Sequence, residues 1–256
     1  MANILILAPT AVSAIAVSRG AGGANLGSFD PKEVWTDAAV DTAATIDLDL
    51  GAAKSIDTIA LVAIYGPVAG ATWTITGGAG GYTDAVIKAA SALRAIDAAG
   101  QAPNVSHALW TGGAVNVRYI RISVIQPAGN PVLSIGRAIC GAGFVPSWNK
   151  EWGAGRGVID TGTSTRLPSG GFAIVGGAKL GTYKWTFGDL SEAEYEALYA
   201  MQLDSGETGP VLVAEDPAAT TAQRNRIHYG LLRSLRPFER RNPKQTRWEL
   251  SMEEWI

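Results

Sequence analysis

The sequence predicts a mainly β protein, in which a jelly-roll β-sandwich precedes a β-rich module with one α-helix. The chain has 31 Gly and 12 Pro among 256 residues, more than the usual combined share of about 12%. An excess of both without a repeat indicates many turns between short strands. Several segments alternate apolar and polar residues at period two, and 47% of residues are hydrophobic. The chain can therefore bury a sizeable core.

The composition excludes several classes of site. Cys140 is the only cysteine, so the chain can form no internal disulfide and no cysteine-based zinc site. Two histidines, His107 and His228, are too few for a His-rich metal site. The net charge of −2 gives no overall attraction to nucleic acid. No apolar run reaches the roughly 18 residues of a membrane span, so we expect no membrane insertion.

The first half reads as a series of strands. Asn3–Leu7 is interpreted as an opening strand rather than a signal peptide, because it lacks a basic start and is followed by Pro9 and Thr10. Ala44–Leu50 places three aliphatic residues on one face and Asp47 and Asp49 on the other. Further strands are predicted at Ile56–Ala63, Thr72–Thr76, Val117–Ile125 and Leu133–Ile139. The Ala-rich segment Asp84–Ala98 favours a short helix over an irregular excursion, since it lacks Gly and Pro.

The second half starts after a connection over residues 144–171, rich in Gly and containing Trp148 and Trp152. We expect this connection to be ordered, because two tryptophans are costly to leave in water. A helix is predicted over residues 191–203, where Ser191 and Glu194 form a capping box. Its apolar stripe of Tyr195, Leu198 and Met201 should pack on the aromatic face of a strand at Leu180–Gly188. The remaining predicted strands are Pro210–Ala214, His228–Leu235 and Thr246–Met252.

No catalytic machinery is apparent, so the protein is not expected to be an enzyme or to hold a cofactor. There is no G-x-S-x-G elbow and no phosphate-binding glycine loop. Asp47 and Asp49 have a spacing that suits a glycosidase pair, but alternating Asp is ordinary on a solvated strand face. Both histidines are interpreted as surface or hydrogen-bonded structural residues.

Three binding hypotheses remain. A calcium site is conceivable around Asn25, Asp30 and Asp37, but without a dense acidic pattern no metal site is predicted. Trp35 and Trp110 lie near predicted loops and are the candidates for carbohydrate contact, whereas Trp73 alternates within a strand and favours the core. The stretch Arg224–Arg247 holds eight basic residues. Their mutual repulsion favours an assembly surface over a nucleic-acid site, and the candidate residues are Arg233, Arg236, Arg240 and Arg241.

The first half resembles the discoidin, or F5/8 type C, group of galactose-binding-like β-sandwiches. The pieces that carry the resemblance occur in the family's order: Trp35–Thr36, TIDLDLG at Thr45–Gly51, IDTIALV at Ile56–Val62 and VRYIRISV at Val117–Val124. The resemblance covers about residues 1–143. The sequence lacks the family's terminal disulfide and shows no obvious set of sugar-binding loops, so the resemblance implies the fold more than carbohydrate recognition.

The second half, residues 172–256 with the preceding connection, is similar to tail structural proteins of tailed bacteriophages. YKWTF, LSEAEYEALYAM and PVLVAEDP give a strand, a helix and a strand, and RWELSMEEW closes a long β return. The resemblance implies that the second half is a β-rich, tail-tube-like module with one α-helix. It also implies a minor tail or baseplate protein of the virion, made in the bacterial cytoplasm, that contacts other tail proteins and copies of itself in a ring. The alternative is a carbohydrate-binding adhesion module that contacts a host glycan.

Overall fold

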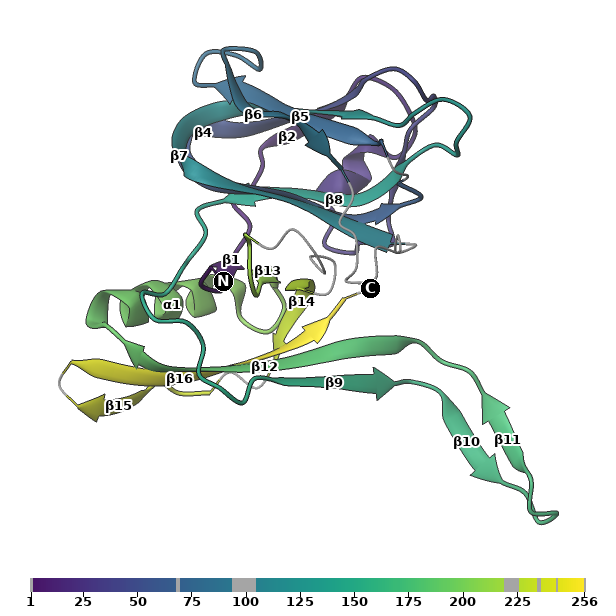
Figure 1. Cartoon of the computed structure of the whole chain (residues 1–256), viewed down its shortest axis with the longest axis vertical. Helices are drawn as coiled ribbons and strands as arrows, with labels where there is room; N and C mark the ends of the chain where they lie inside the picture. The colour runs from purple at the N-terminus through teal and green to yellow at the C-terminus, as the bar shows by residue number, and fades with distance from the viewer. Residues whose placement is uncertain are drawn as a thin grey trace. The chain divides into compact units, whose positions relative to one another are not determined.

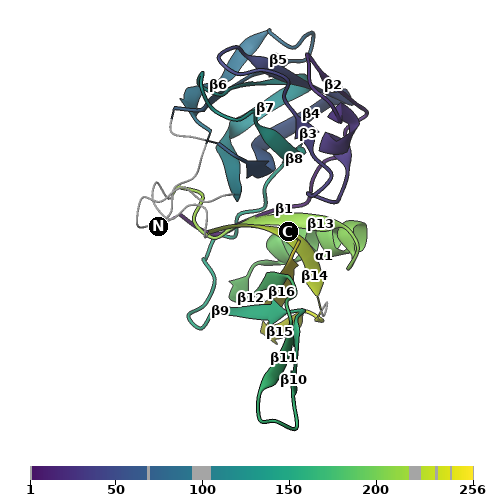
Figure 2. The ribbon, with the colours of Figure 1, turned by 90° about the vertical axis from the view of Figure 1, so that its right-hand side faces the viewer.

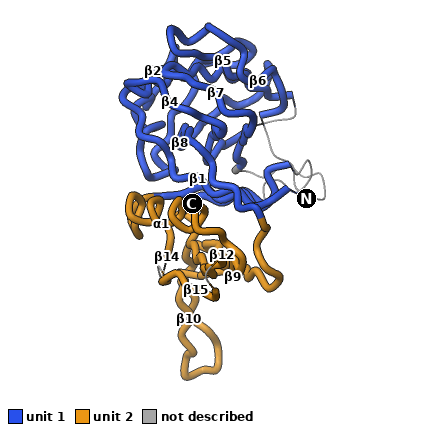
Figure 3. The backbone as a smooth tube through the Cα atoms, turned by 90° about the vertical axis from the view of Figure 1, so that its left-hand side faces the viewer, with its two compact units in different colours: residues 1–147, 210–229 blue, residues 148–209, 230–256 orange. Residues whose placement is uncertain are grey.

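The computed structural model describes residues 2–67, 70–93, 105–218, 226–233, 236–242 and 244–255. The chain forms two compact units, coloured separately in Figure 3: unit 1 is residues 1–147 and 210–229, and unit 2 is residues 148–209 and 230–256. The predicted fold class is confirmed, since the described residues are mainly strand with one α-helix. The expected division of the chain differs from the observed one. Residues 148–171, most of the expected connection, belong to unit 2 and contain two of its strands. Residues 210–229 belong to unit 1.

Unit 1 is built around a β-sandwich (Figures 1 and 2). Its strands run in the order β3-β8-β4-β7-β5-β6, and β2 pairs with β4. All pairings are antiparallel. The strands are β2 (Ala14–Val17), β3 (Trp35–Thr36), β4 (Ala44–Tyr65), β5 (Thr72–Gly78), β6 (Ala85–Ala92), β7 (Val105–Ile125) and β8 (Ser134–Gly141).

The long strand β4 joins two segments that the sequence predicts as separate strands. Its register with β7 shifts between Asp49 and Lys54, where Gly51 has a φ of 76°. The first half pairs with β2 and β7, whereas the second half pairs with β7 and β8. A register shift or bulge of this kind allows one long strand to bend at a corner of a β-sandwich and to pair with different strands on either side of the bend. The aliphatic face of both halves enters the core together with Trp73.

The helix predicted over Asp84–Ala98 is wrong for its described part. Residues Ala85–Ala92 form β6, which pairs with β5 from Thr72↔Ala92 to Gly77↔Ala85, and residues 94–98 lie outside the described residues. The backbone groups along β5 need hydrogen-bond partners, and satisfying them outweighs the weak helical preference of an Ala-rich segment.

Residues 210–229 belong to unit 1 because they pair with the start of the chain. β1 (Leu5–Leu7) is antiparallel to β13 (Pro210–Ala214), whose predicted bounds are confirmed. Ile6 also bridges to Phe144. All residues of both strands are buried. The remaining elements of unit 1 are the short 3-10 helix η1 (Gly23–Gly27) and the start of β14 (Ile227–Arg233).

Unit 2 is an antiparallel sheet with one helix and a projecting hairpin (Figure 1). Within it the end of β14 pairs with β16, which also pairs with β12 and β15, and β12 pairs with β9. The helix α1 (Glu192–Ser205) starts at the predicted capping box of Ser191 and Glu194 and ends at Gly206. The strands are β9 (Gly155–Asp160), β10 (Thr163–Arg166), β11 (Phe172–Val175), β12 (Lys179–Leu190), β15 (Glu239–Asn242) and β16 (Gln245–Glu254).

The predicted stripe of α1 is partly confirmed. Leu198 is fully buried, and Tyr195 and Met201 are half-buried. The aromatic contact to the sheet passes through Phe238, whose ring centroid lies 4.8 Å from that of Tyr195 and 5.1 Å from that of Trp248. Trp248 in turn stacks on Phe187 of β12. Sequence reasoning missed Phe238. Among the described helical segments, none is long and apolar enough to cross a membrane.

Candidate functional site

The hairpin formed by β10 and β11, residues 163–175, is here called the hairpin arm. It is a two-stranded sheet of its own, paired from Thr163↔Val175 to Arg166↔Phe172, and it projects beyond the ends of β9 and β12 (Figure 1). Every residue of both strands is exposed. The exposed residues include Phe172 at 60% and Ile174 at 76%. A lone hairpin is marginally stable in water, and exposed apolar patches mark interaction surfaces. The arm therefore has the features of an element that a partner covers.

The base of the hairpin arm is closely packed. Thr161 N–H donates to the Ala178 carbonyl at 3.0 Å. A Cβ added to Gly177 would lie only 2.1 Å from the backbone nitrogen of Gly162, so glycine is required for the two strands to approach. The arm thus projects from a base with little room to rearrange.

Unit 2 also exposes two large aromatic side chains that lie four residues apart in the sequence, Trp148 and Trp152, here together called the tryptophan surface. Trp148 is 72% exposed and Trp152 is completely exposed. The expectation of an ordered connection rests on the cost of exposing tryptophans to water, and that reason does not hold, since both side chains are exposed. Large aromatic side chains are enriched at the buried centres of protein interfaces. The tryptophan surface is therefore a second candidate contact region.

The four arginines predicted as an assembly surface are exposed but already paired inside unit 2. The closest N–O distances are 2.9 Å for Arg233 to Glu253, 3.1 Å for Arg236 to Glu249, 3.1 Å for Arg240 to Glu192 and 3.8 Å for Arg241 to Glu151. The argument from unrelieved repulsion is therefore wrong. The role of these arginines in assembly stays a prediction without that support. Arg224 lies outside the described residues.

The two tryptophans predicted to contact carbohydrate are poorly placed for it. Trp35 is fully buried, and its Nε1–H donates to the Arg19 carbonyl at 3.0 Å, which corrects the expectation of a surface role. Trp110 is only half-buried, and it packs against the core. A Cβ on Gly112 would lie 2.4 Å from its ring, so the glycine backbone lies against one part of the indole. Trp73 is buried in the core, as predicted.

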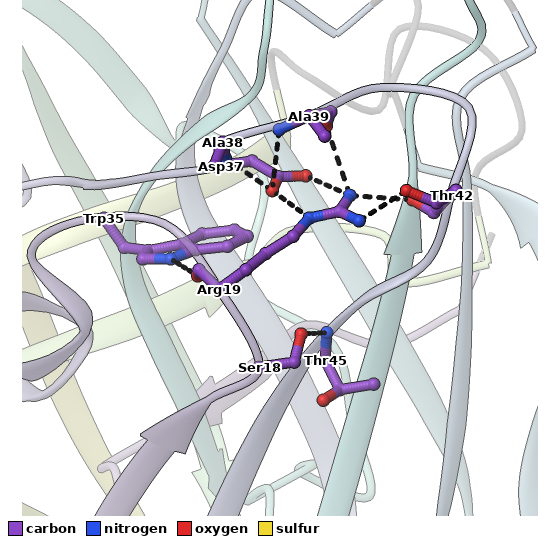
Figure 4. Close-up of polar contacts among 8 residues, drawn as sticks. All are labelled: Ser18, Arg19, Trp35, Asp37, Ala38, Ala39, Thr42 and Thr45. Atoms are coloured by element: carbon purple, nitrogen blue, oxygen red, sulfur yellow. Dashed lines mark hydrogen bonds and ion pairs between the residues drawn. The ribbon is translucent and has the colours of Figure 1, made fainter.

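The loop proposed for calcium is instead held by Arg19 (Figure 4). Arg19 Nε and Nη2 donate to the two oxygens of Asp37 at 2.6 and 3.0 Å. The same guanidinium also donates to the carbonyls of Ala39 and Thr42 and to the Thr42 hydroxyl. Oxygen atoms of these kinds are the ligands that calcium prefers, and here a guanidinium occupies them. Across the part of the chain that the structure describes, no group of three acidic, Cys or His side chains could hold a metal ion.

Asp47 and Asp49 form two cross-strand pairs on the outer face of the sandwich. Arg121 donates twice to Asp47 at 2.6 and 2.7 Å, and Arg118 donates twice to Asp49 at 2.8 and 3.0 Å. The hydrogen bonds from Arg118 lower the pKa of Asp49. A carboxylate held in this way is a poor general acid, because catalysis of glycoside hydrolysis needs one group with a raised pKa. The glycosidase hypothesis therefore gains no support from this pair.

Two half-exposed tyrosines lie over these arginines and are here grouped with them as the tyrosine patch: Tyr82, Tyr119, Arg118 and Arg121. The Tyr82 and Tyr119 rings meet edge to face with centroids 5.0 Å apart. Arg118 lies 4.7 Å from the Tyr119 ring centroid, and Arg121 lies 5.3 Å from that of Tyr82. The patch thus combines two half-exposed aromatic rings with arginines that lie over them and are held by ion pairs. The patch was not predicted from the sequence; Arg118, Tyr119 and Arg121 come from β7, and Tyr82 comes from a turn.

The histidines and the cysteine have structural surroundings. The Ala63 N–H donates to Nδ1 of His107 at 3.2 Å, at a residue whose positive φ of 54° needs such support. Nε2 of His228 lies 3.0 Å from a carboxylate oxygen of Glu215, and both side chains are buried. Burial raises the pKa of the Cys140 thiol to about 12, which leaves it protonated at neutral pH.

No protein-family model and no curated protein matches the chain. Several solved carbohydrate-binding modules resemble part of it in structure. A chitosan-binding module from a chitosanase/glucanase of Paenibacillus sp. IK-5 has 13% sequence identity and a TM-score of 0.42, over 52% of this chain and 97% of that one. CBM32-3 from a family 31 glycoside hydrolase of Clostridium perfringens has 17% identity and a TM-score of 0.42, over 54% of this chain and 94% of that one. The family 32 module of NanJ from C. perfringens, in complex with galactose, has 13% identity and a TM-score of 0.40, over 54% and 99%. Likeness this distant leaves function to be argued from the geometry of this chain.

Proposed function

We propose that the protein is a structural subunit that assembles with copies of itself through the hairpin arm. The observation that carries the proposal is the arm's exposed apolar surface, which includes Phe172, Ile174 and Val175 on a projecting two-stranded hairpin. Such a surface is unfavourable in a permanent monomer. In finer terms, we propose a component of a phage tail tip or baseplate, as the resemblance of the second half implies.

The tryptophan surface supports a second copy as the partner. Unit 2 carries two unlike apolar surfaces, the arm and the tryptophan surface. When the arm of one copy covers the tryptophan surface of the next, both are buried by a single kind of contact. A contact between unlike surfaces is heterologous, and its repetition produces a ring if the rotation closes. This arrangement fits a ring-forming tail component.

Replacing Phe172, Ile174 and Val175 together with Thr is expected to convert the oligomer into a folded monomer. Thr removes the apolar contact while keeping the β-branched preference for strands. Sedimentation velocity measures the change, and circular dichroism with thermal unfolding checks the fold. Val86→Thr is the matched control, because Val86 is equally exposed but lies on β6 of unit 1. A wild-type protein that sediments as a monomer, or an arm variant that assembles normally, contradicts the proposal.

The tyrosine patch favours carbohydrate binding by unit 1 as a second candidate function. Aromatic faces beside charged hydrogen-bonding groups suit a sugar ring, which has apolar C–H faces and polar edges. Tyr82 and Tyr119 are the half-exposed rings, and the paired arginines hold fixed positions beside them. The patch would serve adhesion to a host glycan in an assembled particle.

Replacing Tyr82 and Tyr119 with Ala is expected to abolish any glycan binding by the wild-type protein. A glycan array identifies a ligand, and titration of that ligand should show at least tenfold weaker binding by the double variant. Tyr199→Ala is the control, because this exposed tyrosine lies on α1 of unit 2. Absence of wild-type binding across the array, or unchanged binding by the double variant, rejects the tyrosine patch as a glycan site.

A further inference from the structure

Unit 1 contains a partly enclosed cavity of about 310 Å³ that neither candidate function uses. One wall is the N-terminal segment that follows β1, and the opposite wall is β8. Gly27, the last residue of η1, and Phe29, which follows shortly after it, also line the cavity. The remaining lining residues are Pro9, Thr10, Ala11, Val12, Ile15, Arg137, Ala138 and Ile139. The cavity is thus mainly apolar, with one charged side chain in its wall.

That charged side chain, Arg137, is only 7% exposed and lacks a counter-ion. Its Nη1 donates to the Tyr229 hydroxyl, and its guanidinium lies 4.7 Å from the Phe29 ring centroid and 5.6 Å from that of Tyr229. Its Nε has no hydrogen-bond partner. No carboxylate among the described residues forms an ion pair with it.

A buried guanidinium without a carboxylate is unusual. Charged side chains are almost never fully buried unless paired, because removing an isolated charge from water is costly. Two aromatic faces offset part of this cost through cation–π attraction. The fold therefore leaves one positive charge in the cavity wall without a direct counter-ion.

We infer that this cavity binds a small organic carboxylate, with the anionic group at Arg137 and the apolar body against Phe29, Val12 and Ile139. A guanidinium recognises a carboxylate through charge-assisted hydrogen bonds, which are about twice as strong as neutral ones. One cation matches a monoanion better than a phosphate dianion, which needs more donors. The volume lies at the lower end of the roughly 300–1,000 Å³ of ligand pockets, so the ligand is small. This inference is independent of the proposed assembly.

The test compares three probes on the full-length protein by titration calorimetry or ligand-observed NMR: benzoate, its neutral analogue benzamide, and inorganic phosphate. Benzoate is expected to bind, and benzamide and phosphate to bind at least tenfold more weakly. Failure of benzoate to bind at millimolar concentration overturns the inference. Equal binding of benzamide, or tighter binding of phosphate, overturns it as well.

Arg137→Met is the decisive variant, because it keeps an unbranched apolar stem and removes the guanidinium with its charge. The variant should fold, since the Tyr229 hydroxyl retains the Phe29 carbonyl as its acceptor at 2.9 Å. Benzoate binding is expected to fall at least tenfold. Ala11→Trp provides a second route, because Ala11 is an exposed lining residue and the indole blocks the cavity while leaving Arg137 intact.

Arg226→Met is the matched control, since Arg226 is paired with Asp216 in unit 1 and does not line the cavity. It should bind benzoate as the wild type does. Unchanged benzoate binding in both Arg137→Met and Ala11→Trp places the ligand elsewhere and overturns the inference. A loss of benzoate binding in Arg226→Met equal to that in Arg137→Met also overturns it.

Discussion

Leu198→Asp is expected to abolish the folding of unit 2. Leu198 is the fully buried residue of α1, and the helix covers the aromatic contact between Phe238 and Trp248. Placing a carboxylate there removes about 2–5 kcal/mol of packing and adds the several kcal/mol needed to bury an unpaired charge. A small domain has about 5–15 kcal/mol of stability in total, so the loss is close to complete. Limited proteolysis and near-UV circular dichroism measure it.

Leu203→Asp is the matched control on the same helix. Leu203 is 68% exposed, so its replacement by Asp should lower the free energy of unfolding by only about 1 kcal/mol, through lower helix propensity and repulsion from the C-terminal end of the helix. A Leu198→Asp variant that stays soluble and unfolds cooperatively near the wild-type temperature would mean that α1 is not packed as described.

Trp35→Ala is expected to lower the free energy of unfolding of unit 1 by about 3–5 kcal/mol. The indole is fully buried, and its N–H holds the Arg19 carbonyl in the loop that Arg19 and Asp37 cross-link. Removing the ring leaves a cavity and an unpaired carbonyl. Hydrogen–deuterium exchange of the strands of unit 1, followed along a denaturant series, measures the change in unit 1.

Val86→Thr is the corresponding control, because Val86 is an exposed residue of unit 1. It should leave stability within about 0.5 kcal/mol of the wild type. A Trp35→Ala variant with wild-type stability but without glycan binding would contradict this account. It would mean that Trp35 contacts carbohydrate, as the sequence predicted, and is not a buried structural residue.

The regular elements were predictable because local signals and tertiary demands agree. Asp47 and Asp49 alternate with buried aliphatics in β4, and this pattern marks both the strand and its outer face. Ser191 and Glu194 mark the start of α1, since capping is decided within four residues. Pro210–Ala214 is a continuous apolar run bounded by glycine and acidic residues, and it forms β13.

The candidate sites were harder to predict because they depend on contacts between distant residues. The arginines that seemed mutually repulsive meet carboxylates from other strands and from α1; Arg240 and Glu192, for example, are 48 residues apart. The arm contains Ser, Thr and Gly without clear periodicity, so its strands give no local signal. β6 forms because β5 offers it a partner, which no Ala-rich sequence reveals. Arg137 reads as a surface residue in sequence, and only the packing of Phe29 and Tyr229 buries it.

The central claim is that the hairpin arm of one copy binds the tryptophan surface of another, and mixing two defective variants tests it most directly. One variant carries Thr at Phe172, Ile174 and Val175, and the other carries Ser at Trp148 and Trp152. The first variant retains only the tryptophan surface and the second retains only the hairpin arm, so each alone should sediment as a monomer. Their mixture should form a 1:1 heterodimer and nothing larger, because a heterologous contact is complemented once. A mixture that remains monomeric, while the wild-type protein assembles, contradicts the account.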